Sequence, residues 1–139
     1  MFLGEYTHTV DDKGRVTIPA RFRADLATGV VVTRGLDRNL TIYPLEEWRD
    51  LADKIMSKPV TDPSVRSFRR RLFAGAVDLE LDRQGRILLP PYLREFADID
   101  GEVVVVGNYN NIEIWNSAGW ETARRDSEDD DESFFALNI

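Results

Sequence analysis

Two short segments of the 139-residue chain place an arginine directly after a glycine, in a turn that an aspartate opens. They are Asp11–Arg15 (D-D-K-G-R) and Asp82–Arg86 (D-R-Q-G-R). Glycine supplies the positive φ that a tight turn needs. The planar guanidinium of arginine can grip phosphate oxygens or read the O6 and N7 atoms of guanine. Lys13 and Arg83 add a further base to each turn, so both turns are candidate contacts for phosphates or bases.

Strand alternation predicts which way these arginines point. In segments 15–18 and 86–89 the apolar residues are expected to face inward, and the leading Arg15 and Arg86 outward. Two outward arginines at equivalent positions could contact an anionic partner. Each arginine could instead pair with the aspartate that opens its own turn, as an ion pair that stabilises the loop.

The two turns belong to an internal repeat. A shift of 71 residues superimposes Asp11, Gly14 and Arg15 on Asp82, Gly85 and Arg86. With one inserted residue, 40–43 then matches 112–115, and Trp48 matches Trp120. Duplication of a small domain, with a pseudo-twofold axis between the halves, is the simplest explanation.

The sequence pattern of each half predicts the same series of elements: two strands around the turn, a short helix, and a hairpin. The expected strands are 6–10, 15–18, 30–33 and 40–43 in the first half, and 77–81, 86–89, 103–106 and 112–115 in the second. Pro19 and Pro90 are expected at the first position of short helices that run to about Ala27 and Ala97. Segments 37–39 and 108–111 are the expected hairpin turns.

Helical sequence lies between the halves and after them. Leu45, Trp48, Ala52 and Ile55 form an apolar stripe at helical spacing, Asp62-Pro63 opens a second helix, and a last helix is expected from Ser117. The predicted organisation is residues 1–57 as a first domain with its helix, 58–72 as a linking helix, 73–120 as a second domain, and 121–139 as an acidic C-terminal helix and tail.

Composition argues against an enzyme. The chain has no cysteine, and its single histidine, His8, falls on the inward face of a strand, where a packed role is expected. No carboxylates have the spacing of a matched acid and base, and no glycine-rich phosphate loop occurs. We therefore expect no catalytic residue, metal, cofactor or small-molecule ligand. The absence of a signal peptide or a long apolar run predicts a soluble, cytoplasmic protein with no membrane partner.

The charge balance argues against tight nucleic-acid binding by one subunit. The net charge is -7, and residues 121–139, with seven acids and two arginines, account for -5 of it. The remaining residues 1–120 carry only -2, so one face could still be basic. DNA-binding domains are usually basic overall, and a single copy is expected to bind weakly.

The paired turns resemble those of the MraZ family of bacterial transcriptional regulators, over about residues 1–120. The matching motifs are Met1-Phe2-x-Gly4, 11–15, Tyr43-Pro44, Glu47-Trp48 and Glu113-Ile114-Trp115. The resemblance implies an α+β fold in which two tandem AbrB-like (SpoVT-AbrB) swapped-hairpin halves form a pseudo-twofold β-barrel core with flanking helices. It also implies a ring-shaped homo-oligomer associated with the nucleoid.

The function that this resemblance implies is repression, through direct promoter repeats in double-stranded DNA, of the division and cell-wall gene cluster, including the regulator's own gene. The family's DNA-contacting residues carry over to Lys13, Arg15 and Arg86. Gln84 stands where a second lysine would lie, and Arg83 is expected to compensate. The alternatives are an AbrB-like antitoxin or transition-state-type regulator, and a ring scaffold that binds no DNA.

Assembly is the expected role of several other residues. Trp48 and its stripe are expected in the core or at a subunit interface. The cluster Arg66, Arg69 and Arg70 is expected to meet acidic helix residues of a neighbouring subunit, although DNA is an alternative partner. The acidic run 126–132 is a solvated segment or a competitor of DNA for basic surface. The apolar end of the tail could dock on the ring.

Overall fold

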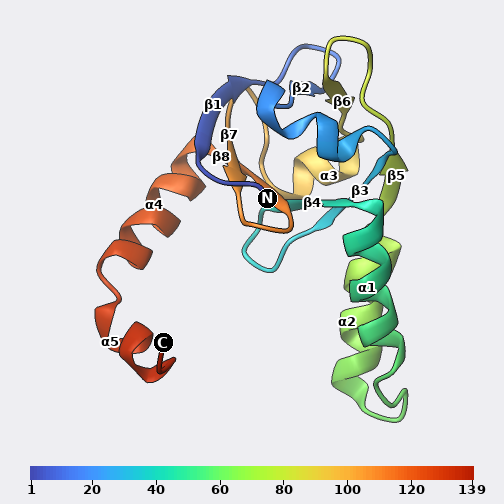
Figure 1. The fold of residues 1–139 in the computed structure, drawn as a ribbon, viewed down its shortest axis with the longest axis vertical. Coiled ribbons are helices and arrows are strands. Elements are labelled where there is room, and N and C mark those ends of the chain that lie inside the picture. Colours follow the sequence, from blue (N-terminus) through green and yellow to red (C-terminus); the bar gives the residue numbers. More distant parts are fainter.

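The strands of the two halves exchange partners across the chain. In the computed structural model, which describes residues 1–139, six strands form one antiparallel sheet in the order β1-β7-β8-β4-β3-β5 (Figure 1). β1 (Glu5–Thr9) lies beside β7 (Glu102–Gly107), and β5 (Val77–Leu79) lies beside β3 (Val30–Arg34). The first strand of each half therefore pairs with the hairpin of the other half. The exchange of strands between halves that the family resemblance implies is present.

A pseudo-twofold relation is visible in the strand register. β2 (Arg15–Thr17) pairs with β6 (Arg86–Leu88) in a separate antiparallel ladder, with Val16 opposite Ile87. β4 (Leu40–Pro44) pairs with β8 (Ile112–Asn116), with Thr41 opposite Glu113. Each central pair joins two residues that the sequence repeat superimposes, so one pseudo-twofold axis passes through both ladders.

The pairing does not show the expected closure into a barrel. β1 and β5 are the edges of the six-stranded sheet, and β2 and β6 pair only with each other. The two-stranded ladder instead packs over the sheet. Its inward side chains are fully buried in a single core that draws on both halves: Val16, Ile18, Ile87 and Leu89. The inward directions predicted by strand alternation are confirmed.

The predicted short helices after the two turns are present, but neither begins at the predicted proline. Residues 20–26 form two 3-10 helices, Ala20–Phe22 and Ala24–Leu26. Pro19 and Pro90 are not the first helical residues, because both keep an extended ψ and serve as N-caps. In the second half, Pro91 takes the first position of α3 (Pro91–Phe96). Helical backbone is disfavoured at a residue that precedes a proline. Because Pro91 follows Pro90, the helix starts one residue later than predicted.

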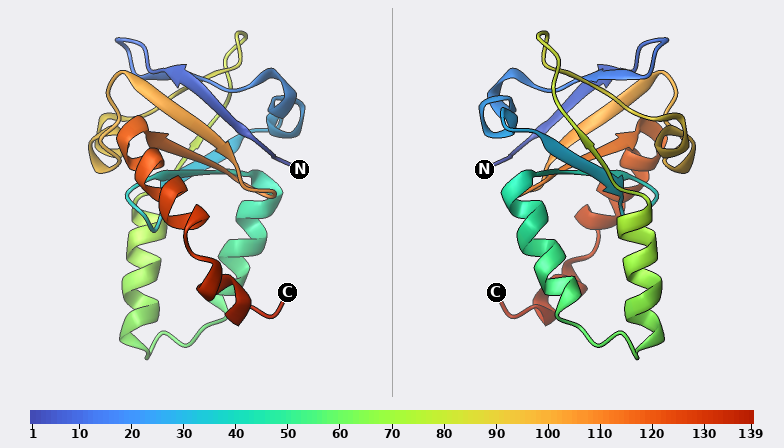
Figure 2. Two further views of the ribbon diagram at one scale, coloured as in Figure 1. Left: turned by 90° about the vertical axis from the view of Figure 1, so that its left-hand side faces the viewer. Right: turned by 90° about the vertical axis from the view of Figure 1, so that its right-hand side faces the viewer.

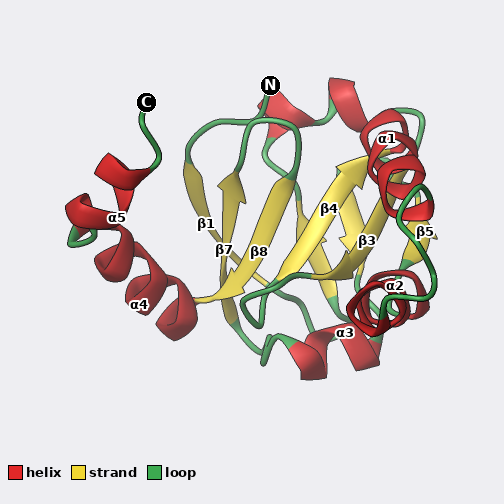
Figure 3. Ribbon diagram, turned by 90° about the horizontal axis from the view of Figure 1, so that it is seen from below, coloured by secondary structure: helices red, strands yellow, loops and turns green.

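Two helices form a hairpin that projects from the sheet. They are α1 (Leu45–Met56) and α2 (Pro63–Ala74), with Asp62 capping α2 through Ser64 N as predicted. α4 (Ser117–Glu128) and α5 (Asp131–Ala136) leave the sheet on the opposite flank (Figures 1 and 3). The two arginine turns project from the other end of the molecule (Figure 2). No helix is long and apolar enough to cross a bilayer.

Candidate nucleic-acid interface

The two turns are built by the same hydrogen-bond network. In the first, Asp11 Oδ1 accepts the backbone N–H groups of Lys13 (3.0 Å) and Arg15 (2.8 Å), and Asp11 Oδ2 accepts Arg15 Nε–H at 2.6 Å. In the second, Asp82 Oδ1 accepts the backbone N–H groups at positions 84 and 86, each at 2.9 Å, and Asp82 Oδ2 accepts Arg86 Nε–H at 2.8 Å. The predicted ion pairs within the turns are therefore confirmed.

These bonds keep both carboxylates ionised. The backbone N–H of Arg15 is the largest cause that lowers the pKa of Asp11, which falls to about 2 with help from the Arg15 side chain and the Lys13 backbone. The pKa of Asp82 is lowered in the same way, first by the backbone N–H of Arg86. Each turn therefore holds its shape, and its arginine, across the pH range in which proteins work.

The ion pairs leave part of each guanidinium free. Only Nε of Arg15 and of Arg86 is hydrogen-bonded within the chain, and the terminal amino groups have no acceptor. The side chains are 29% and 26% exposed, so the outer edge of each guanidinium reaches the surface. An arginine fork fixed at Nε and open at both terminal nitrogens is oriented to bind phosphate or guanine oxygens. The two expectations for these arginines, ion pair and anion contact, are compatible.

The outer face of the β2–β6 ladder joins the two turns into one surface. Arg15 lies opposite Leu88, and Thr17 lies opposite Arg86. Opposite residues share a face, and diagonal neighbours in such a ladder are about 7–8 Å apart. Leu88 is 54% exposed and places an apolar side chain on this face between the two turns. A two-stranded ribbon of this kind has the dimensions to enter the major groove of DNA.

Thr17 and Leu88 were missed when only charged residues were considered. The alternation that directs the two arginines outward also directs these residues outward, so the signal was present in the sequence.

Arg23 and Arg94 are two further bases that the sequence analysis did not select. Arg23 Nε–H donates to Ile18 O at 2.9 Å, and Arg94 Nε–H donates to Leu89 O at 3.0 Å. Each guanidinium lies against the turn glycine of the other half: a Cβ added at Gly14 would lie 2.8 Å from Arg94 Cζ, and one at Gly85 would overlap Arg23. Both glycines have positive φ, as predicted. The repeat superimposes Arg23 on Arg94, and this equivalence was the sequence signal that could have identified them as part of the site.

The turns and these two arginines form a basic patch on an acidic protein. Residues 11–15 and 82–86, with Arg23 and Arg94, contain six bases and three acids, whereas the whole chain has a net charge of -7. Lys13 and Arg83 are exposed near the loop tips. The structure thus brings together all four residues predicted to contact DNA.

The arginines of α2 lie away from this patch. α2 is at the opposite end of the molecule from the turns (Figure 2). Arg66 Nη1 donates to Val60 O (2.9 Å) and Thr61 O (3.2 Å), and neither Arg69 nor Arg70 forms an ion pair within the chain. Trp48 packs within its own subunit, against Tyr43 and Phe73.

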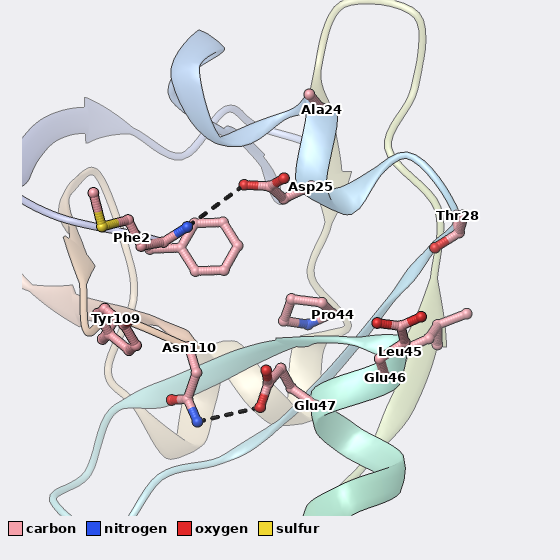
Figure 4. Close-up of a pocket in the computed structure, with 11 residues that line it drawn as sticks. Phe2, Ala24, Asp25, Thr28, Pro44, Leu45, Glu46, Glu47, Tyr109 and Asn110 are labelled. Atoms are coloured by element: carbon pink, nitrogen blue, oxygen red, sulfur yellow. Dashed lines mark hydrogen bonds and ion pairs between the residues drawn. The ribbon is translucent and has the colours of Figure 1, made fainter.

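A separate cavity of about 410 Å³ lies beneath the N-terminus (Figure 4). The terminal amino group of Met1 lies 3.9 Å from Asp25 Oδ2, and Asn110 Nδ2 donates to Glu47 Oε2 at 3.3 Å. These groups pair with one another rather than converging on an open position. No group of three metal-ligating side chains occurs in the chain. His8 is half-buried in β1, consistent with its expected packed role.

Comparisons with known proteins agree with this duplicated architecture. A family model described as "MraZ protein, putative antitoxin-like" matches twice, over residues 1–71 and 72–137. The chain is 58% identical over 122 residues to the "Transcriptional regulator MraZ" of Herpetosiphon aurantiacus, covering 88% of this chain and 85% of that relative. It is 52% identical to the protein of the same name from Moorella thermoacetica, covering 93% and 90%. These relatives are named as regulators, not as enzymes, in agreement with the expectation for this chain. The chain belongs to the MraZ family.

Proposed function

We propose that this protein is a DNA-binding transcriptional regulator that contacts duplex DNA with the outer face of the β2–β6 ladder and the two flanking turns. The observation that carries the proposal is the duplicated turn, in which an aspartate fixes Nε of Arg15 or Arg86 and leaves the terminal nitrogens open. The printed names of the relatives support a role in transcription.

In this proposal the ribbon enters the major groove, and each arginine binds a phosphate or the edge of a guanine. A well-placed bidentate contact to a base contributes about 1–3 kcal/mol of discrimination. Thr17 and Leu88, on the same face, offer methyl groups that suit contact with the thymine methyl. Lys13, Arg83, Arg23 and Arg94 supply the surrounding positive charge. Residues 1–57 and 73–120 act as the two DNA-reading domains, and 58–72 links them.

We further propose that the protein acts as a ring-shaped homo-oligomer on direct promoter repeats, as a nucleoid-associated repressor of the division and cell-wall gene cluster and of its own gene. A patch of six bases and three acids neutralises few phosphates, so one subunit gains little affinity from its contacts with the DNA backbone. Linked subunits on successive repeats raise the effective concentration of each contact. Assembly therefore offsets the weakness of one subunit.

A binding titration with promoter DNA tests the proposal. Arg15→Ala and Arg86→Ala should each weaken binding by roughly tenfold or more, whereas Arg49→Ala, an exposed arginine on α1 far from the turns, should leave it unchanged. DNA with several repeats should bind far more tightly than DNA with one. If neither turn variant weakened binding, the assignment of the interface would be wrong. Equal affinity for one repeat and for an array would contradict the role of assembly.

A further inference from the structure

The C-terminal segment after α4 exposes more apolar surface than an isolated tail of a folded protein should. Phe134, Phe135, Leu137 and Ile139 are 45%, 82%, 63% and 106% exposed. They follow four consecutive acids, Asp129–Glu132. A contiguous exposed patch of this kind marks a binding surface. The segment therefore has the composition of an acidic and apolar docking peptide, with no partner in its own chain.

A groove of complementary composition lies at the far end of the α1–α2 hairpin. It has a volume of about 480 Å³ and is lined by apolar Ile55, Val65 and Phe68 together with Lys54 and Lys58. Neither lysine forms an ion pair within the chain. The hairpin segment 54–70 contains five bases and one acid. A groove with an apolar floor and unpaired lysines at its rim is complementary to a peptide that carries both apolar and acidic side chains.

The one acid of this segment, Asp62, is occupied by hydrogen bonds within the hairpin. Asp62 accepts the backbone N–H of Ser64 at 2.9 Å and its hydroxyl at 2.7 Å, as the cap of α2. Met56 and Val60, each 54% exposed, extend the apolar surface beside the groove. The whole tip of the hairpin is thus basic and apolar at once, and it is left uncovered.

The position of α4 directs the tail away from the groove of its own chain. Trp120 packs on Trp115, with ring centroids 5.8 Å apart, and its Nε1–H donates to Glu5 Oε2 at 3.1 Å. Arg124 bridges Glu121 and Glu128 along the helix. The contacts of Trp120 hold α4 on one flank of the sheet, with α1 and α2 on the other (Figures 1 and 3).

We propose that the C-terminal segment Asp129–Ile139 of one subunit docks in the α1–α2 groove of the next. The tail and the groove are different surfaces on opposite flanks of the subunit, so the contact between them is heterologous. Heterologous contacts generate a ring when the rotation from one subunit to the next closes. The phenyl rings of Phe134 and Phe135 fill the groove, and the preceding acids meet Lys54 and Lys58. This inference rests on the self-assembly proposed above and assigns that assembly a specific contact.

Sedimentation over a range of protein concentrations, without DNA, tests the contact on the full chain. The tail variant Phe134→Ser/Phe135→Ser and the groove variant Lys54→Glu/Lys58→Glu should each raise the concentration needed for assembly by more than about tenfold, since aromatic anchors dominate interface energies. Leu36→Ser, an exposed apolar residue elsewhere, and Arg49→Glu, on α1 outside the groove, are the matched controls and should assemble normally. All substituted side chains are exposed or at the groove rim, and an unchanged circular dichroism spectrum verifies folding.

Two combinations separate this contact from its alternatives. Asp130→Lys/Asp131→Lys placed in the groove variant should restore assembly through the reversed charges. A mixture of the tail and groove variants retains one intact donor and one intact acceptor, so it should form a 1:1 dimer that grows no further. Wild-type assembly that persists in the tail variant would overturn the docking contact alone. A wild type that stays monomeric would overturn both the docking contact and the ring, whereas DNA contact through Arg15 and Arg86 is measured independently. A mixture that forms no dimer would overturn the docking contact, because an intact tail and an intact groove are both free in it.

Discussion

The two turns share one backbone design but present different residues to the outside. The aspartate, glycine and arginine are the same in both, and so are the hydrogen bonds among them. At the loop tip, Lys13 corresponds to Gln84 in the repeat, and on the outer face Thr17 corresponds to Leu88. The residues that shape the turn and its arginine are retained, while their exposed neighbours at positions 13/84 and 17/88 have diverged.

This difference bears on the DNA sequence that the ribbon can recognise. A reader with identical halves matches a palindrome, because protein symmetry is mirrored in the half-sites. In this protein the backbone of the two turns is nearly symmetric, whereas the outer surface of the turns and the β2–β6 ladder is not. An asymmetric site, repeated in one direction, is the sequence that such a surface fits, which agrees with the direct repeats proposed above.

Adjacent residues of β6 offer the sharpest contrast and the largest expected effect. Ile87 is 1% exposed at the centre of the pseudo-twofold, and Leu88 is 54% exposed on the outer face. Ile87→Ala should lower the free energy of unfolding by about 2–5 kcal/mol, because it leaves a cavity in the core. Leu88→Ala should change it by less than about 0.5 kcal/mol and weaken DNA binding instead. Urea unfolding and fluorescence anisotropy would measure both. Equal destabilisation by the two variants would contradict the opposite faces assigned to them.

The turn glycines test the contact between the halves. Gly85 and Gly101 have similar positive φ, 74° and 79°, but only a Cβ at Gly85 would meet another side chain, that of Arg23. Gly101→Ala should cost about 1–2 kcal/mol from backbone strain alone. Gly85→Ala should cost up to about 1.5 kcal/mol more, the contribution of the hydrogen bond from Arg23 to Ile18 O that it disturbs. Thermal unfolding would compare them, and identical losses would show that Arg23 contributes nothing there.

Exchanging the loop-tip residues should have a smaller effect on DNA affinity, and it is read most clearly from the salt dependence of binding. Lys13→Gln should lower the slope of log affinity against log salt concentration by about 0.9, the loss of one phosphate contact. Gln84→Lys should raise it by a similar amount if the second turn approaches the backbone as closely as the first. Anisotropy at several salt concentrations would measure the slopes. A slope unchanged by Gln84→Lys would place the second tip away from phosphate.

The smallest expected effect is on the titration of Asp11. Its pKa is lowered to about 2, so the stabilisation it provides is fully present above its ordinary value of 3.8 and is lost as the pH falls through about 2. Arg15→Ala should raise the pKa only part of the way, because the backbone N–H, the largest cause, remains. NMR titration of the carboxyl carbon would follow this change. A pKa near 3.8 in the wild type would contradict the hydrogen-bond network of the turn.

Local patterns in the sequence predicted most of the elements and the turns, whereas partners distant in sequence were not predictable from the residues alone. The glycine turns, the strands and the Asp62 cap follow from nearest-neighbour chemistry. The contact of Arg23 with the turn of the other half depends on the exchange of strands between the halves. The internal repeat was the only feature of the sequence that indicated such an exchange. The short helix predicted at 20–26 takes the form of two 3-10 helices that bury Phe22 and Leu26 in the core, and local preference alone did not specify that form. Barrel closure was an expectation from family resemblance, and the strand pairing does not show it.

The central claim is that both turns face the same stretch of DNA, and site-directed cleavage tests it most directly. The chain has no cysteine, so Lys13→Cys and Gln84→Cys each give a single attachment point for an iron chelate that cuts nearby DNA. Ser67→Cys, on α2 at the opposite end, is the control. The account predicts cuts from positions 13 and 84 within the same groove, a few base pairs apart, and none from position 67. Cuts from only one turn, or stronger cutting from position 67, would contradict it.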